Sequence, residues 1–175
     1  MAGKHLSIML ATQTISDAEK DAIKRRRIAA NDPITLREVG KDYYRERDYE
    51  KALQHWSRAA RLRDADAHYC LTILYLEGLG VEKDEKKRLY HLEEASIGGH
   101  LVARRNLGID ELSNGWLERS VKHFIIAANL GDEESVEFLK EVHEMGAIGI
   151  EVYDAAVRGY QAAVDATKSP EREAA

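Results

Sequence analysis

The chain has 175 residues, of which 44% are hydrophobic and 33% charged, a balance that is typical of a folded globular protein and excludes a wholly disordered chain. Its formal net charge of −5 disfavours the strongly basic class of nucleic-acid-binding proteins, so we expect no nucleic-acid partner. The single cysteine, Cys70, excludes an internal disulfide and a cysteine-based zinc site within the chain, and it favours a reducing, cytoplasmic location.

The first expected elements in chain order are a tail and a helix. Residues 1–15, which we expect to form a flexible tail, contain an apolar stretch at 6–11 that is too short for a signal peptide. No part of the chain approaches the roughly 20 apolar residues of a membrane helix, so we expect no membrane partner. Ser16 and Glu19 form a capping-box pattern, which predicts a helix over residues 16–30. The basic run at 24–27 is typical of a solvated helix face, with a nuclear address or a nucleic-acid contact as alternatives.

The next part of the chain, residues 31–166, repeats itself. Four alanines recur at separations of 36, 32 and 36 positions, and a large apolar residue precedes each alanine by three positions. The pairs are Trp56 and Ala59, Leu92 and Ala95, Phe124 and Ala127, and Tyr160 and Ala163. A repeat of this length predicts one supersecondary unit per copy, stacked on its neighbours to bury a shared core.

A second pattern recurs in phase with the first. A small residue is followed after four and eight positions by an aliphatic residue and by an aromatic or polar one, a spacing that places all three on one helix face. The sets are Thr35, Val39 and Tyr43; Ala67, Leu71 and Tyr75; Ala103, Leu107 and Glu111; and Ser135, Leu139 and His143. Each repeat therefore predicts two helices, A and B, and aspartates stand where N-caps belong: Asp32, Asp48, Asp64, Asp84 and Asp132. We predict an all-α superhelix of four hairpins, over residues 31–63, 64–99, 100–131 and 132–166, with a C-terminal tail at 167–175.

The second repeat carries a family resemblance. The loop Gly-Leu-Gly-Val-Glu-Lys-Asp at residues 78–84 is preceded in the sequence by Ala67, Leu71 and Tyr75 and followed by Ala95. This sequence pattern resembles the Sel-one-like repeat (SLR), a relative of the tetratricopeptide repeat. The resemblance covers about residues 31–166 and implies a right-handed solenoid of antiparallel helical hairpins that acts as an adaptor for other proteins. The chain also resembles small algal and diatom SLR proteins whose repeats often follow a RING-type zinc finger; the finger's ligands are absent here.

No set of residues has the spacing of a catalytic or metal site, so we predict a protein that is not an enzyme and has no cofactor. His55, His91 and His123 share one repeat position, but stacked hairpins lie ~10 Å apart and metal ligands must lie within ~2.1 Å of the ion. Packing or partner contact is the favoured interpretation of these histidines. We expect Cys70 to be a small buried residue.

By analogy with related solenoids, helices A should line a concave groove. The predicted groove residues run from basic through apolar to acidic: Arg37, Lys41, Tyr44, Arg45, Tyr69, Ile73, Leu76, Arg105, Ile109, Leu112, Glu137 and Glu141. We expect a scaffold that binds a protein or peptide of complementary charge order and is a monomer or weak homo-oligomer. One alternative is a solvated surface covered by the N-terminal segment or a second copy. The alternative function is a non-catalytic substrate-binding or regulatory subunit of a ubiquitin-ligase complex.

Overall fold

The computed structural model describes residues 16–173, with side chains through 167, and within this range the chain is all-helical. The prediction of a tail over residues 1–15 lies outside the described residues. The helices are α1 (Asp17–Ala29), α2 (Pro33–Arg45), α3 (Tyr49–Ala60), α4 (Ala65–Glu77), α5 (Glu85–Ile97), α6 (Leu101–Ser113), α7 (Leu117–Asn129), α8 (Glu133–Glu144) and α9 (Ile150–Glu173). None of these helices is both long and apolar enough to cross a membrane.

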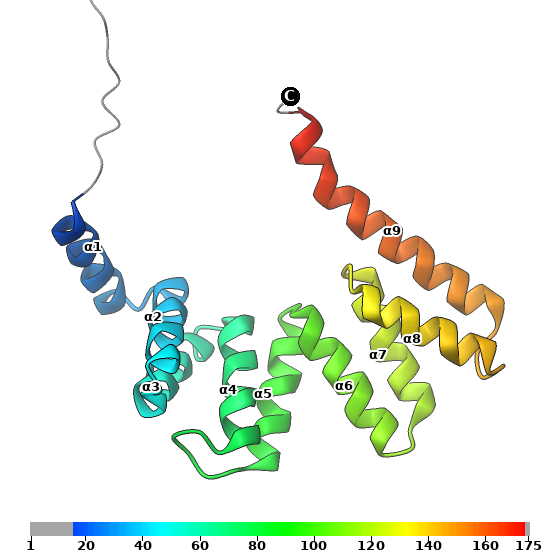
Figure 1. The fold of residues 1–175 in the computed structure, drawn as a ribbon, viewed down its shortest axis with the longest axis horizontal. Helices are drawn as coiled ribbons and strands as arrows, with labels where there is room; N and C mark the ends of the chain where they lie inside the picture. Colours follow the sequence, from blue (N-terminus) through cyan, green and yellow to red (C-terminus); the bar gives the residue numbers. More distant parts are fainter. Residues whose placement is uncertain (1–15, 174–175) are drawn as a thin grey trace, which may run out of the picture.

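The helices form a solenoid that curves into an arch (Figure 1). Helices α2 and α3, α4 and α5, and α6 and α7 pack as hairpins, and each B helix also packs on the A helix of the next repeat. Helices α1 and α9 rise from the two ends of the arch. The predicted all-α superhelix of helical hairpins is confirmed.

Aspartate side chains start most of these helices, as the sequence predicts. Asp32, Asp48, Asp64, Asp84 and Asp132 each accept a hydrogen bond from the backbone N–H three residues later. Such a bond satisfies one of the four N–H groups that a helix start leaves without a partner. The predicted capping box of α1 is also present. These caps fix where the hairpins begin, and therefore which side chains face outward.

Close approach of the two helices of a hairpin depends on residue size. A Cβ atom on Gly40 would lie 2.3 Å from Trp56 Nε1, and one on Gly108 would lie 2.8 Å from the Phe124 ring. The second repeat has Thr72 at the glycine position and the smaller Leu92 at the aromatic position, and both side chains are buried. The core is therefore filled by matched pairs, in which a larger residue on one helix goes with a smaller one on the other.

The fourth repeat differs from the prediction. Ala156 of α9 is fully buried beside Leu139 and Val142. Ala163, further along α9, is only partly buried and lies near Gly131, in the turn that joins α7 to α8. The buried alanine thus stands about two helical turns before the predicted one. Helix α9 also continues to Glu173, beyond position 166, where we expected the last repeat to end.

Candidate functional site

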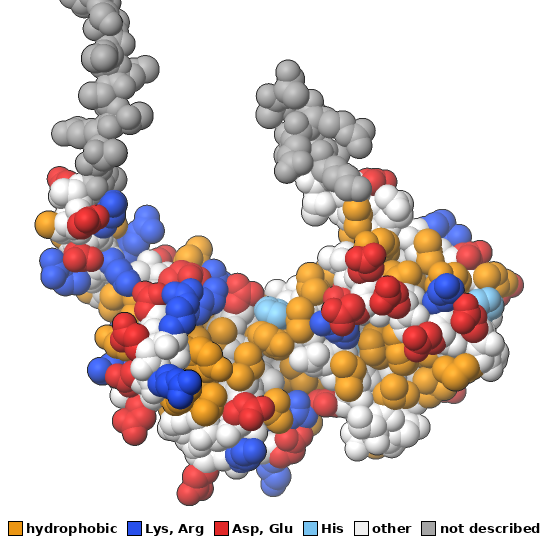
Figure 2. Space-filling model, viewed as in Figure 1, with side chains coloured by type: hydrophobic (Ala, Val, Ile, Leu, Met, Phe, Trp, Pro, Cys, Tyr) orange, Lys and Arg blue, Asp and Glu red, His pale blue; other side chains and the backbone are white. Residues whose placement is uncertain are grey.

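The predicted groove residues lie on α2, α4, α6 and α8, at positions outside the fully buried stripe of each helix, and we call this set of positions the A face. Three rows of equivalent positions cross it from repeat to repeat. The rows are Arg37, Tyr69, Arg105 and Glu137; Lys41, Ile73, Ile109 and Glu141; and Tyr44, Leu76, Leu112 and Glu144. On the side shown in Figure 2, hydrophobic side chains form a band across the middle of the arch and acidic side chains gather over α8. The structure therefore gives this side distinct apolar and charged regions.

Two arginines of the first row connect successive repeats. Arg37 Nη1 lies 3.1 Å from Asp64 Oδ2 and 2.6 Å from an Asp66 carboxylate oxygen, and Arg105 Nη1 lies 2.7 Å from Asp132 Oδ1. Only 18% of the Arg37 side chain and 16% of the Arg105 side chain is exposed. Because Asp64 and Asp132 cap the next A helix, each arginine connects two repeats and is largely unavailable to a partner.

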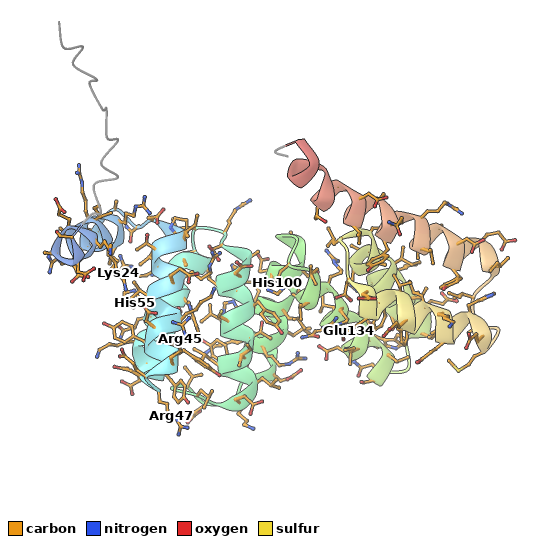
Figure 3. All side chains as sticks on the ribbon, turned by 45° about the horizontal axis from the view of Figure 1, so that its top comes forward. Lys24, Arg45, Arg47, His55, His100 and Glu134 are labelled. Atoms are coloured by element: carbon orange, nitrogen blue, oxygen red, sulfur yellow. The ribbon has the colours of Figure 1, made fainter. Side chains whose placement is uncertain are left out.

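An aromatic pair makes the same connection after the second repeat, and its second member, His100, is labelled in Figure 3. The Tyr69 ring stacks on His100, with ring centroids 4.2 Å apart, and His100 Nδ1 accepts a hydrogen bond from the Ala103 N–H at the start of α6. Burial lowers the pKa of His100, against the opposing effect of the Asp66 carboxylate. The ring is therefore neutral near pH 7 and can accept the capping hydrogen bond.

Sequence reasoning missed these connections, although a signal for two of them was present. Arg37 and Asp64 are 27 positions apart, as are Arg105 and Asp132. A search for an arginine followed by an aspartate at a constant separation of 27 positions would have found both.

The middle of the A face is apolar and open. Leu76 is 48% exposed, Ile109 46% and Leu112 40%, and Ile73, which precedes Ile109 in the second row, is half-buried. Tyr44 is different, since its ring packs on Trp56 and Tyr49 and belongs to the core of the first repeat. The exposed apolar residues therefore come from α4 and α6.

The basic end of the A face is neutralised within the chain. Lys41 Nζ lies 2.9 Å from Glu38 Oε1, and Arg45 Nη1 lies 2.8 Å from Asp42 Oδ1. At the acidic end, Glu137 and Glu141 are exposed and make no ion pair within the described part of the chain. The basic end therefore offers little unpaired positive charge, whereas the acidic end offers unpaired carboxylates.

The three equivalent histidines lie within their own hairpins. His55 stacks on Tyr43 and His91 on Tyr75, with ring centroids 5.5 and 5.6 Å apart, while His123 is half-buried at the position opposite Glu111. Burial lowers the pKa of all three imidazoles, that of His91 to about 4, where the neighbouring His68 adds to the effect. Their contacts are those of neutral packing residues.

The side chains that could bind a metal or react covalently are dispersed. Among residues 16–167, no three His, Cys, Asp or Glu side chains come together in a way that could hold a metal ion. Cys70 is half-buried, and burial raises the pKa of its thiol to about 11, which keeps it in the weakly reactive protonated form.

Comparison with known families agrees with this geometry. The Sel1 repeat model matches residues 37–64, 65–100 and 103–132, which together make up more than half of the chain. The chain belongs to the Sel1 repeat family. The predicted resemblance is confirmed for the first three repeats, and the fourth hairpin lies outside the matched segments.

Solved structures support the same fold for this Sel1 repeat protein. The crystal structure of a Sel1 repeat protein from Oxalobacter formigenes is similar with a TM-score of 0.65 and 24% identity, over 81% of this chain and 61% of that one. The protective antigen c5321 of uropathogenic Escherichia coli strains, which displays an SLR fold, is similar with a TM-score of 0.61 and 18% identity, over 86% of this chain and 33% of that one. The chain thus spans less than two thirds of either protein. No curated protein matches it significantly.

Proposed function

We propose that this Sel1 repeat protein is a non-catalytic scaffold that binds a protein or peptide partner on its A face. Sel1 repeat proteins are generally scaffolds for protein interactions. The observation that carries the proposal is the set of exposed aliphatic side chains on α4 and α6: Leu76, Ile109 and Leu112. Adjacent exposed apolar side chains rimmed by charged ones are typical of a protein-binding surface.

The connections between repeats support the same role. The Arg37, Tyr69 and Arg105 contacts join each A helix to the start of the next one. A surface that is already ordered before binding loses less conformational entropy when a partner docks, so more of the contact energy appears as affinity. We propose a cytoplasmic location, which the single free Cys70 favours.

The test compares two double variants in an affinity capture from native extract with quantitative mass spectrometry. L76D/I109D places charge on the A face, and I97D/I126D places the same charge on exposed positions of α5 and α7. We expect the first variant to lose partners that the wild type and the second variant retain. Equal capture by all three proteins would exclude the A face as the binding surface.

The identity of the captured proteins decides between the two functions. Ubiquitin-ligase components among the partners that depend on the A face would identify the protein as a non-catalytic subunit of such a complex. Their absence from that set would leave a scaffold of another assembly.

A further inference from the structure

We propose that the partner of the A face is a segment with apolar side chains next to lysine or arginine, and that its basic end lies on α8. This inference rests on the proposed function and names the chemical class of its partner. The apolar part would dock on Leu76, Ile109 and Leu112, and the basic part would face Glu137 and Glu141.

The cations of the A face give a partner little to recognise. Arg37 and Arg105 are mostly buried in their ion pairs, Lys41 lies beside Glu38, and Arg45 lies beside Asp42. An acidic partner segment would have to displace a carboxylate that is already in place, so it would gain little from replacing one pair by another. Of the two charged ends predicted from the sequence, only the acidic end on α8 therefore offers unpaired charge to a partner.

The carboxylates of α8 are in the opposite situation. Glu133, Glu137 and Glu141 follow one another at intervals of four residues, are exposed, and make no ion pair within the described residues. Like charges at this spacing lie on one helix face and repel one another. A cationic segment on α8 would relieve that repulsion, which makes such a segment the favoured occupant.

Apolar positions are followed by acidic ones along the rows of the A face. In the second row, Ile73 and Ile109 are followed by Glu141, and in the third row Leu76 and Leu112 are followed by Glu144. A single extended or helical segment that crosses the hairpins thus passes from an apolar to an acidic surface. A partner that matches this surface needs both its apolar side chains and its basic ones.

Selection from a display library of short random peptides on the wild-type protein tests the inference. We expect enriched peptides to combine apolar residues with Lys or Arg, and to bind E137Q/E141Q about fivefold more weakly than the wild type. The matched control, E93Q/E118Q, removes two exposed carboxylates from α5 and α7 and should bind as the wild type does. Weaker binding at high salt should accompany the charge preference.

The outcomes separate this inference from the proposed function. Peptides that lose binding to L76D/I109D but show no preference for positive charge, or bind E137Q/E141Q normally, would overturn the inference and leave the A face as the binding surface. Peptides that bind L76D/I109D normally, or a library with no enrichment, would overturn both. Enriched acidic peptides would show that the cations, despite their intramolecular pairs, select the partner.

Discussion

Size matching between the two helices of a hairpin predicts that a core defect in the third repeat can be repaired from the opposite helix. The variant G108T places a side chain where a Cβ atom would already lie 2.8 and 2.9 Å from two atoms of the Phe124 ring. Its hydroxyl has a partner available, because the equivalent Thr72 donates to the carbonyl four residues earlier at 3.2 Å. The defect in G108T is therefore steric.

The expected magnitudes follow from this geometry. Overpacking costs about 1–3 kcal/mol, and threonine recovers only a few tenths of a kcal/mol over glycine in helix propensity, so we expect G108T to lose about 2 kcal/mol of unfolding free energy. F124L should lose about 1–2 kcal/mol, partly through the stacking of Phe124 on Phe138. The double variant recreates the Thr72 and Leu92 pair of the second repeat, and it should be more stable than the sum predicts by about 1–2 kcal/mol.

Urea unfolding followed by circular dichroism and tryptophan fluorescence measures these differences, provided that the two probes report the same transition. The matched control combines G108T with L36V, a core change in the first repeat whose effect should simply add. Strict additivity of G108T and F124L would refute the size-matching explanation.

Three further predictions concern charge and pH. R105M removes the cation from the Asp132 carboxylate, which is only 5% exposed and keeps only its hydrogen bonds from Ser135, and should lower the unfolding free energy by about 2 kcal/mol in a urea titration; an unchanged midpoint would contradict the connecting role of Arg105. Since burial and His68 lower the pKa of His91 to about 4, the unfolded chain binds more protons between pH 6.5 and 4, and stability should fall as the pH drops through that range. For this half-buried group the loss should be about 1–2 kcal/mol, and H91Q should reduce the pH dependence of the melting temperature. E137K should stabilise α8 by about 0.5–1 kcal/mol through new pairs with the carboxylates four residues away on either side, while it weakens binding of a basic peptide; lower thermal stability would contradict the proposed repulsion.

Much of the fold could be predicted because the relevant signals are local. Spacings of four placed Ala67, Leu71 and Tyr75 on one helix face, and the capping aspartates fixed where the helices begin. Each of these patterns depends on residues within two turns of one another. The repeat then supplied the tertiary arrangement, since identical units can bury their apolar faces only by stacking.

The parts that could not be predicted depend on contacts between repeats or on side-chain direction. Tyr44 occupies the same row as the exposed Leu76, yet its ring turns onto Trp56, a choice of rotamer that spacing does not reveal. Arg37 was expected to line the groove, and its partner in the next repeat limits that role. The position of the buried alanine of α9 was missed because Ala156 packs with Leu139 and Val142 of α8, a contact between helices that the spacing of the repeat does not reveal.

Site-specific photo-crosslinking tests the central claim most directly. A photoreactive amino acid replaces Leu76 or Ile109 on the A face, or Ile97 or Ile126 on the B helices, and each protein is irradiated in native extract. The account predicts a common crosslinked partner at Leu76 and Ile109 that is absent at the two B-helix positions. Crosslinks to that partner from Ile97 or Ile126, with none from Leu76 or Ile109, would contradict it.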